Sequence, residues 1–389
     1  MPNLNIGVFT GNRAEFGLLR PLFRAISRAP DMSLSLFVGG ALLNEKYGQN
    51  LQEISQENIT IAARIEIPEP GANGVSTSSA IGIAIQKCEE AFLDQNLDGL
   101  FVYADRYEGF AAVIAASHSN LPVLHIEGGD ITEGGAYDDN VRHAMTKLSH
   151  LHFTSNELAS DILKEMGEEA WRIQNVGLLP FAEKKTSDYL TPRDLWEAME
   201  LELNRNIVLF TLHSISSSVE QTKMEAEASF QALKKICSKP ETSVVITYPN
   251  DDNGSDVILK EIDRIRSSSP NFHVFPSLGQ RRYYGILNLS RHGFDVVCMG
   301  NSSSIVKECV FFGVTGILIG SRQNGRLIPN NVSKCSAELD AILTCYDGRT
   351  KDNSSLDNPY YVENGVELAL EHLRLHIKNP RILRKKYER

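Results

Sequence analysis

Short apolar runs alternate with amphipathic segments along almost the whole chain. In the first half, the apolar runs cover residues 4–10, 32–38, 61–67, 99–104, 122–126 and 150–154. A second series covers residues 207–213, 243–248, 272–275, 295–299 and 315–319. Runs that lack strict polar alternation and are separated by helical segments are typical of strands buried on both faces of a parallel sheet. The sequence therefore predicts an α/β fold with two Rossmann-like parallel-sheet domains, which we expect to face one another across a cleft.

The predicted domain boundaries follow from where the strand signal stops. Residues 181–205 are polar and helix-prone and lack a strand pattern, so we interpret them as a linker. This linker separates an N-terminal domain, 1–180, from a C-terminal domain, 206–360. A last helical pattern lies in 361–389 and no strand follows it. We expect this helix and tail to pack back on the N-terminal domain.

Charge and hydropathy exclude several classes of protein. The 389 residues include 39 basic and 49 acidic side chains, and the net charge of −10 argues against nucleic acid as a partner. No apolar run reaches the roughly 18 residues that cross a bilayer, and the first residues do not follow the pattern of a secretion signal. We therefore expect a cytoplasmic protein with no membrane partner.

Neither the cysteines nor the histidines show the spacing of a metal site. The six cysteines are scattered and contain no C-x-x-C pair, which suits reduced core thiols better than disulfides or zinc. His372 and His376 lie four residues apart without a glutamate or third ligand, so we interpret them as surface histidines. The sequence predicts no metal and no cofactor.

Ligands of parallel α/β sheets bind beyond the carboxyl ends of the strands, and several of these ends are polar in this chain. The first, Thr10-Gly11-Asn12-Arg13, precedes a helix in which Pro21 is expected only within the first turn. Arg13 then lies beside a helix amino terminus, where backbone amides and the helix dipole favour an anion such as phosphate. A structural ion pair is the alternative for Arg13. No G-x-G-x-x-G and no Walker lysine follow, so neither a nicotinamide site nor a P-loop is supported.

Three carboxylates lie near the ends of two neighbouring predicted strands. Asp105 ends one strand, Glu127 ends the next, and Asp138 opens a helix after a glycine-rich stretch. Carboxylates that lie close together push their pKa values apart, which provides one acid and one base near neutral pH. The alternatives are that Asp105 caps its helix, that Glu127 is solvated, and that Asp138 caps the next helix and pairs with Arg142. Arg142 and His143 belong to the polar face of that helix.

The second series of strands ends in groups suited to phosphate. His213 can donate to a phosphate or to a leaving oxygen. Ser302 and Ser303 lie between a strand and a helix, where hydroxyls and free amides can hold a diphosphate, and Glu308 can accept from ribose hydroxyls. Arg322 ends the next strand and can bind phosphate through two hydrogen bonds. These ends predict a site for a nucleotide with an attached reactive group, whose non-phosphate end faces the carboxylates.

Several long motifs, in the same order, give the chain a resemblance to a known family. They are T-G-N-R-A-E-F from Thr10, A-D-R from Ala104, H-I-E-G-G-D from His125, D-D-N-V-R-H-A-M-T-K-L from Asp138, G-N-S-S-S-I-V-K-E from Gly300 and G-S-R-Q-N-G-R from Gly320. The sequence resembles the hydrolysing UDP-N-acetylglucosamine 2-epimerases of sialic and related nonulosonic acid biosynthesis. The resemblance implies the two-domain glycosyltransferase-B architecture and a homodimer or homotetramer.

The resemblance also implies roles for individual residues. It places the catalytic groups at Asp105, Glu127, Asp138 and His213. It places most UDP contacts in the C-terminal nucleotide-binding domain, at His213, Ser302, Ser303, Glu308 and Arg322. Two more UDP contacts, Arg13 and Arg106, lie in the N-terminal domain. Secondary positions fall to Arg142 and His143, and no metal is involved.

The implied reaction is an elimination followed by a hydration. A carboxylate removes the C2 proton of the sugar while UDP leaves C1, and water adds to the resulting 2-acetamidoglucal with inversion at C2. UDP-N-acetylglucosamine and water then give N-acetylmannosamine and UDP, the first step of sialic acid synthesis. The glycine-rich stretch between Glu127 and Asp138 is about two residues longer than in the N-acetylglucosamine enzymes, and Gly17 replaces a serine that can contact the nucleotide. A UDP- or GDP-linked 2,4-diacetamido-trideoxy sugar, as in legionaminic acid synthesis, is therefore an alternative substrate.

Three other functions stay open from the sequence alone. A non-hydrolysing UDP-N-acetylglucosamine 2-epimerase would return the epimerised sugar to UDP. A glycosyltransferase of the same fold would need an acceptor. A non-catalytic nucleotide-sugar sensor would bind without turnover.

Overall fold

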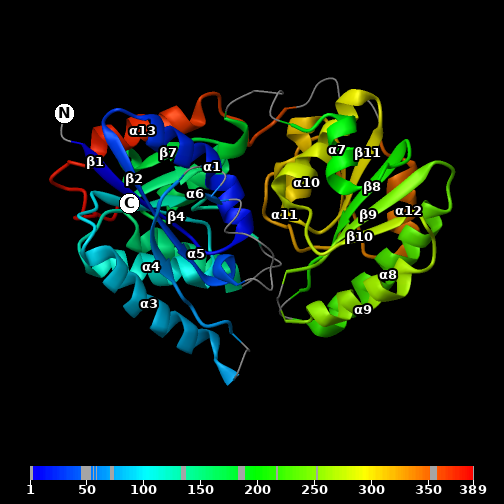
Figure 1. Cartoon of the computed structure of the whole chain (residues 1–389), viewed down its shortest axis with the longest axis horizontal. Helices are drawn as coiled ribbons and strands as arrows, with labels where there is room; N and C mark the ends of the chain where they lie inside the picture. Colours follow the sequence, from blue (N-terminus) through cyan, green and yellow to red (C-terminus); the bar gives the residue numbers. More distant parts are fainter. Residues whose placement is uncertain are drawn as a thin grey trace. The chain divides into compact units, whose positions relative to one another are not determined.

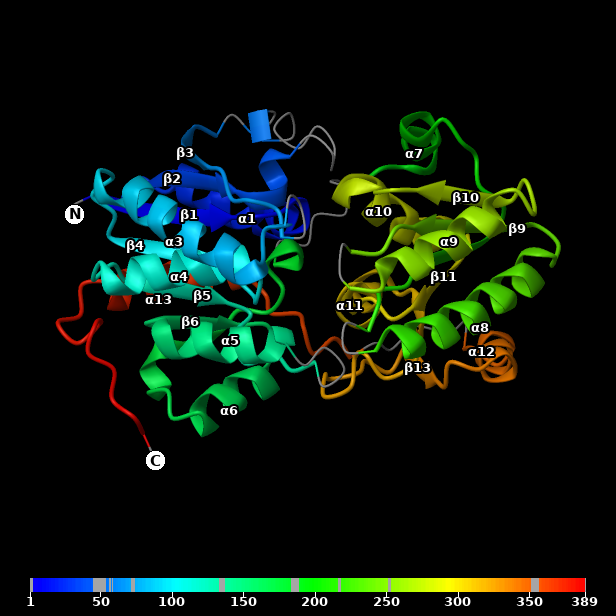
Figure 2. The ribbon, with the colours of Figure 1, turned by 90° about the horizontal axis from the view of Figure 1, so that it is seen from below.

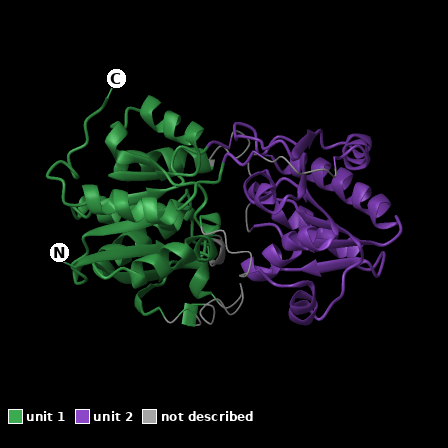
Figure 3. Cartoon of the chain, turned by 90° about the horizontal axis from the view of Figure 1, so that it is seen from above, with its two compact units in different colours: residues 1–130, 137–183, 360–389 green, residues 131–136, 184–359 purple. Residues whose placement is uncertain are grey.

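The chain forms two compact units, each built around its own parallel sheet (Figure 1). Unit 1 contains residues 1–130, 137–183 and 360–389, and unit 2 contains residues 131–136 and 184–359 (Figure 3). The computed structural model describes residues 3–44, 54–55, 57, 59–70, 74–132, 137–182, 189–215, 218–250, 253–350 and 357–388. The predicted fold class, an α/β protein with two parallel Rossmann-like sheets, is confirmed.

Seven parallel strands form the sheet of unit 1 in the order β3-β2-β1-β4-β5-β6-β7. They are β1 (Leu4–Thr10), β2 (Met32–Gly39), β3 (Ile61–Ile65), β4 (Gly99–Tyr103), β5 (Val123–Ile126), β6 (Leu151–Thr154) and β7 (Ile173–Asn175). The apolar runs predict all of these strands except β7, whose three half-buried residues are too few to form a pattern. Because β1 lies between β2 and β4, the strand order reverses there, and ligands of such sheets bind at this switch point.

Helices cover both faces of the sheet in unit 1 (Figure 2). One face packs against α3 (Thr77–Leu93), α4 (Tyr107–His118) and α5 (Tyr137–Leu148). The other face packs against α1 (Arg13–Arg28) and α13 (Gly365–His376). The remaining elements of the unit are α6 (Glu157–Glu165) and the short 3-10 helices η1 (Gly40–Leu43), η4 (Ala170–Arg172) and η5 (Leu179–Phe181).

Helix α13 belongs to unit 1 although it follows unit 2 in the sequence. Leu370 and Leu373 are buried in the same core cluster as β1 and α1. Beyond the helix, the fully buried guanidinium of Arg172 donates to the carbonyl oxygens of Arg381 at 2.9 Å and Ile382 at 2.8 Å. Apolar burial and buried hydrogen bonds therefore hold both the helix and the tail after it.

Six parallel strands form the sheet of unit 2 in the order β10-β9-β8-β11-β12-β13. They are β8 (Asn206–Thr211), β9 (Thr242–Thr247), β10 (Phe272–Phe275), β11 (Asp295–Gly300), β12 (Thr315–Ile319) and β13 (Val332–Cys335). The helices are α7 (Pro192–Met199), α8 (Val219–Cys237), α9 (Ser255–Arg266), α10 (Gly279–Asn288), α11 (Ser303–Lys307) and α12 (Leu339–Asp347), with the 3-10 helices η7 (Leu289–His292) and η8 (Cys309–Phe312). The sequence pattern did not reveal β13, which has a single buried residue.

The segment 181–205, interpreted from the sequence as a linker, contains helix α7. Its residues 184–205 group with unit 2, and within it 183–188 lie outside the described residues. Leu195 is fully buried and its side chain lies against Gly285 of α10. The helix agrees with the helix-prone composition of this segment, and its Leu195 and Met199 are buried.

Two local expectations are wrong. Pro21 lies in the interior of α1, which begins at Arg13, because Asn12 caps the helix and the apolar face of α1 is buried. His372 and His376 are half-buried and not surface residues: their rings contact those of Phe153 and Trp171, with centroids 5.9 and 5.1 Å apart. Burial lowers the pKa of His372 to about 4, so this ring is neutral near pH 7.

All six cysteines are free thiols, and Cys88, Cys237, Cys298 and Cys309 are buried. Across the described ranges, no helix has the length and apolar character that crossing a membrane requires.

The docking of α13 can be tested with two leucines of the same helix. Leu373 is fully buried, whereas Leu375 is 73% exposed. Leu373→Ala should lower the free energy of unfolding by about 2–4 kcal/mol, because it leaves a cavity in the core. Leu375→Ala should change it by less than about 0.5 kcal/mol. Urea unfolding measures both, and equal effects of the two substitutions would show that α13 is not packed into this core.

Candidate active site

The turn from β1 into α1 lies at the switch point of the sheet in unit 1. The side-chain Oδ1 of Asn12 accepts from the backbone amide of Glu15 at 3.0 Å, and Oε2 of Glu15 accepts from the amide of Gly11 at 2.8 Å. These bonds satisfy amides that a helix start leaves unpaired. Arg13 is the first residue of α1, as expected, but its side chain lies outside the described residues.

The end of β4 has a strained backbone directly before Asp105. Ala104 has a φ of +52°, a left-handed conformation that residues with a side chain rarely adopt. Its carbonyl oxygen accepts from Nε2 of His125 at 2.8 Å, and its amide donates to the carbonyl of Ile126 at 2.9 Å. Strain of this kind costs about 1–3 kcal/mol and clusters at functional sites. The two hydrogen bonds fix the direction in which the chain presents Asp105.

The neighbouring strand β5 ends in the same way. Glu127 has a φ of +61° and is only 6% exposed. Its Oε1 accepts from the hydroxyl of Tyr103 at 2.5 Å, and burial together with Glu127 raises the pKa of this tyrosine, which therefore stays a donor. Tyr103 pairs with Ile126 in the register of β4 and β5, so Asp105 and Glu127 follow adjacent strand ends. Glu127 is thus a buried carboxylate and not a solvated one.

A buried arginine joins the carboxylates of unit 1. The guanidinium of Arg142, 2% exposed, binds the carboxylate of Asp105 and donates to Oδ1 of Asp139 at 2.6 Å and to the backbone carbonyl of Asp130 at 2.6 Å. Burial alone would lower the pKa of Arg142, but the aspartates around it raise this pKa above its ordinary value. The ion therefore stays charged in the interior.

The structure corrects two interpretations of this helix and strand end. Asp105 does not cap α4, whose cap position is held by Arg106 without a side-chain hydrogen bond. The partner of Arg142 on α5 is Asp139, three residues before it, whereas Asp138 is an exposed residue of the first turn. The sequence indicated Asp138, but spacings of three and four residues both place side chains on one helix face, so Asp139 fits the same pattern.

His143, a secondary candidate, is half-buried on α5, and burial lowers its pKa. The end of the preceding glycine-rich stretch, 133–136, lies outside the described residues.

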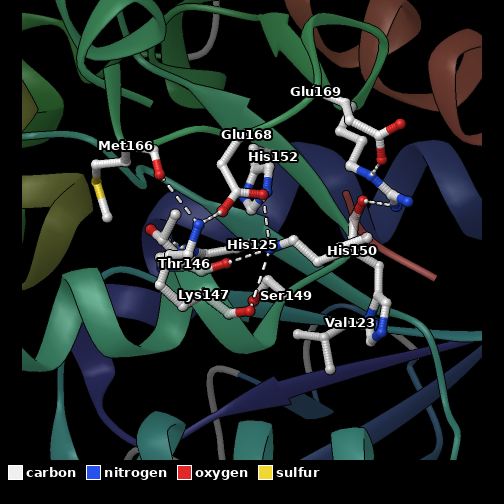
Figure 4. A network of polar contacts seen from close by, with 12 residues as sticks. Val123, His125, Thr146, Lys147, Ser149, His150, His152, Met166, Glu168 and Glu169 are labelled. Carbon is white, nitrogen blue, oxygen red and sulfur yellow. Dashed lines mark hydrogen bonds and ion pairs between the residues drawn. The ribbon is translucent and has the colours of Figure 1, made fainter. Parts of the chain in front are cut away.

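A buried polar network includes His125 of β5 and His152 of β6 (Figure 4). His125 and His152 are register partners on β5 and β6, and burial lowers their pKa values to about 4 and about 3. His152 donates through Nε2 to Oε2 of Glu168 at 3.2 Å, and the Nζ atoms of Lys147 and Lys385 each lie 2.6 Å from this carboxylate. Burial would raise the pKa of Glu168, but these donors lower it to about 2. His125 is therefore a neutral donor, with Nε2 directed at Ala104.

In unit 2, the ends of β8 and β11 are joined by a reciprocal pair of hydrogen bonds. The amide of His213 donates to Oδ1 of Asn301 at 2.7 Å, and Nδ2 of Asn301 donates to the carbonyl of His213 at 2.9 Å. Nδ1 of His213 accepts from the amide of Asn250 at 3.1 Å. Burial and the charge of Arg322 lower the pKa of His213 to about 3, so the ring is neutral and its Nε2 carries the proton.

The loop after β11 holds the predicted serines. Gly300 has a φ of +128°, and a Cβ there would lie 1.9 Å from the carbonyl oxygen of Thr211, so only glycine fits. Ser302 caps α11, and its Oγ accepts from the hydroxyl of Ser304 at 3.0 Å. The hydroxyl of Tyr283 lies 2.7 Å from Oγ of Ser304, which extends the chain of hydroxyl groups.

The other predicted groups of unit 2 lie around the same loop. Ser303 is the first residue of α11, and Glu308 follows its last residue. Arg322 and Gln323 both donate to the carbonyl oxygen of Asn301, at 3.4 and 2.9 Å. Sequence reasoning missed Asn301, although its place directly after a strand-ending glycine was a signal. Among the described residues, no three His, Cys, Asp or Glu side chains form a group that could hold a metal ion.

Comparison with known proteins finds relatives that are named as hydrolyzing 2-epimerases. The chain is 32% identical over 335 residues to the GDP/UDP-N,N'-diacetylbacillosamine 2-epimerase (hydrolyzing) of Campylobacter jejuni. The aligned region covers 85% of this chain and 84% of that protein. It is 31% identical over 336 residues to the UDP-N,N'-diacetylbacillosamine 2-epimerase (hydrolyzing) of Legionella pneumophila, with 86% of each chain covered.

A solved structure has the same fold. The UDP-GlcNAc 2-epimerase of Neisseria meningitidis, bound to UDP-GlcNAc, superposes with a TM-score of 0.78 at 18% identity over 96% of this chain and 100% of that chain. The sequence model of the family described as UDP-N-acetylglucosamine 2-epimerase matches residues 24–374. Because this match spans most of the 389 residues, the chain belongs to the UDP-N-acetylglucosamine 2-epimerase family.

Proposed function

We propose that the protein is a hydrolysing 2-epimerase that acts on a nucleoside diphosphate-linked 2-acetamido sugar. The observation that carries the proposal is the pair of carboxylates at adjacent strand ends. Asp105 follows a residue with a left-handed backbone, and Glu127 has such a backbone itself. Arg142 binds Asp105, Tyr103 donates to Glu127, and His125 donates to the carbonyl before Asp105. Carboxylates fixed in this way can take a proton from one face of a sugar ring and return one to the other.

In the first step, Glu127 removes the proton from C2 of the sugar. The electron pair of the C2–H bond forms the C1–C2 double bond, and the C1–O bond breaks with its electron pair going to the β-phosphate of the leaving diphosphate. The C2 hydrogen is not acidified by a carbonyl group, so the transition state depends on stabilising the leaving group. Asp138 could also serve as the base that removes this proton. We assign the step to Glu127 because Glu127 is buried, whereas Asp138 is exposed.

Unit 2 supplies groups suited to the leaving diphosphate. The neutral ring of His213 can donate from Nε2, and Arg322, Ser302 and Ser303 add charge and hydroxyl groups around the same loop. We propose that Glu308 binds the ribose, and that Arg13 and Arg106 of unit 1 contribute further positive charge. Donors that are already oriented stabilise the developing charge without reorganising during the reaction.

In the second step, water adds across the double bond of the glycal. The hydroxyl group joins C1 and a proton joins C2 on the opposite face, which releases the free 2-epimeric sugar and the nucleoside diphosphate. We propose that Asp105 delivers or steers this proton, with Arg142 holding its charge in place. We propose that Asp138, at the exposed start of α5, exchanges protons with solvent.

Of the two sugars considered from the sequence, we propose the nucleotide-linked 2,4-diacetamido-trideoxy sugar as the substrate. N,N'-diacetylbacillosamine is a sugar of this kind. The support is that both the Campylobacter jejuni and the Legionella pneumophila relatives bear this sugar in their names. UDP-N-acetylglucosamine, which gives N-acetylmannosamine, is the competing substrate.

Substrate and reaction can be tested together by mass spectrometry in deuterated water. UDP-N-acetylglucosamine and the UDP- and GDP-linked diacetylbacillosamine are each incubated with the enzyme, and products are compared with a boiled sample. We expect a free 2-epimeric sugar with one deuterium at C2, formed fastest from a diacetylbacillosamine nucleotide. Retention of the C2 hydrogen excludes the elimination. A sugar still bound to the nucleotide indicates the non-hydrolysing reaction, and turnover only with an added acceptor indicates a glycosyltransferase.

The roles of the carboxylates can be separated by amide substitutions. Glu127→Gln and Asp105→Asn should each lower kcat by about 10²–10⁴-fold, because each removes a group that transfers or steers a proton. In Glu127→Gln, exchange of the C2 hydrogen with deuterated water should be lost as well. Asp161→Asn, at an exposed position of α6, is the control and should keep wild-type kcat. Exchange that survives in Glu127→Gln but is lost in Asp138→Asn would move the base to Asp138.

A further inference from the structure

Two buried carboxyl groups beside the candidate site have no role in the reaction described above. Glu15, in the first turn of α1, is 6% exposed, and Glu108, in the first turn of α4, is fully buried. These helices follow β1 and β4, the two strands at the switch point of the sheet. Buried carboxyl groups are rare unless they are paired, so both require an explanation.

The carboxyl group of Glu108 is enclosed by backbone on two sides. A Cβ on Gly40 would lie 2.9 Å from Oε1 of Glu108, and a Cβ on Gly11 would lie 3.0 Å from its Cβ. Gly40 belongs to η1 and Gly11 to the turn after β1. Side chains at either position would displace Glu108, so the fold leaves this space to its carboxyl group.

Arg106 is one partner of this carboxyl group, and Tyr107 is another. Nε and Nη2 of the guanidinium lie 3.2 and 3.4 Å from the two oxygens of Glu108. The side chain of Arg106 is 37% exposed, whereas that of Glu108 is 1% exposed. The buried carboxyl group therefore holds one edge of a guanidinium whose remainder reaches the surface, next to Asp105. A guanidinium oriented in this way is suited to a phosphate.

Glu15 and Glu108 both lie against Gly11: Oε2 of Glu15 accepts from the amide of Gly11 at 2.8 Å, and a Cβ on Gly11 would lie 3.0 Å from Cβ of Glu108. Burial raises the pKa of Glu15 to about 8, and the negative charges of Glu108 and Asp105 contribute to this rise. The hydrogen bond from the Gly11 amide and the positive charge of Arg106 act to lower this pKa. Among the residues whose side chains are described, Tyr103 is a further titratable neighbour, and η1, which packs against the same turn, carries no titratable side chain. Near neutral pH, Glu15 keeps its proton, and Arg106 does not face a second negative charge from it.

We propose that Glu108 is the positioning residue that directs Arg106 at the nucleoside diphosphate, and that Glu15 must stay protonated for this arrangement to bind the anion tightly. The inference rests on the proposed function, because it takes Arg106 as a diphosphate ligand. It adds two residues to which the sequence motifs assigned no role. Their effect on the ligand is indirect: Glu108 acts through Arg106, and Glu15 acts through the charge it would gain.

The first test is calorimetric titration with UDP, which requires no turnover. Glu108→Gln should weaken UDP binding by about tenfold, because a neutral amide no longer holds the guanidinium in place. In an Arg106→Met background, the same Glu108→Gln substitution should change the affinity by less than about twofold, because its effect passes through Arg106. Glu90→Gln, on the exposed side of α3 in the same unit, is the matched control.

The outcomes separate this inference from the proposed function. If the wild-type protein does not bind UDP, the proposed function fails. If UDP binds and Arg106→Met weakens it, but Glu108→Gln has no effect or has the same effect in both backgrounds, the positioning role is wrong. Thermal unfolding of each variant checks the fold. Glu108→Asp, which keeps the charge but withdraws it by one methylene, should fall between wild type and Glu108→Gln.

The second test is the pH dependence of UDP affinity. As pH rises through about 8, Glu15 loses its proton and places a negative charge beside Arg106. UDP affinity of the wild-type protein should fall by about fivefold between neutral pH and about pH 9.5. Glu15→Gln keeps the group neutral and should remove this fall, while Glu90→Gln should retain it. A wild-type profile without the fall, or a fall that persists in Glu15→Gln, would overturn the role of Glu15.

Discussion

The arrangement of carboxylates in unit 1 depends on the buried guanidinium of Arg142. This group binds Asp105 after β4, Asp139 on α5 and the carbonyl of Asp130 after β5, so three segments meet at one charge. A buried charge is costly unless it is fully paired, and removing one partner leaves the others uncompensated. The three segments therefore depend on one another: each is held by the charge of Arg142, and the partners on the other two segments compensate the cost of burying that charge. The same property fixes Asp105, because a carboxylate bound to an immobile cation cannot turn toward solvent.

Strain in the backbone complements this ionic contact. Ala104 and Glu127 adopt left-handed conformations at adjacent strand ends, and neither is glycine. The neutral ring of His125 offsets part of this cost, because its Nε2 donates to the carbonyl of Ala104 and its Nδ1 lies close to Gly128. His125 is kept neutral by burial, with His152 beside it in the register of the sheet. In the polar network of Figure 4, His152 bonds to Glu168, and His125 is the member that reaches the end of β4, through its bond to Ala104.

How far the sequence predicted this site depends on what each feature requires. The strand ends that carry Asp105, Glu127 and His213 were predictable, because parallel strands are buried runs and their carboxyl ends are known from the pattern. The choice of Asp139 over Asp138 as partner of Arg142 was not predictable, because both spacings fit a helix and only packing decides. Glu108 could not be found either: its importance arises from the space left by Gly11 and Gly40, which are distant in the sequence and adjacent in the fold.

The anion binding that we propose would occur in an acidic chain. The net charge is −10, yet two titratable groups near the predicted phosphate contacts, Glu15 in unit 1 and His213 in unit 2, are held in their neutral forms by burial. For Glu15 this removes a repulsive charge, and for His213 it leaves a single oriented N–H donor. A neutral donor that does not bind the ground state strongly can still stabilise an oxygen on which charge develops as the C1–O bond breaks. In unit 1, the positive charge that we propose for the anion comes from Arg106, whose guanidinium is bound by the buried carboxylate of Glu108, so an acidic residue orients the proposed cation.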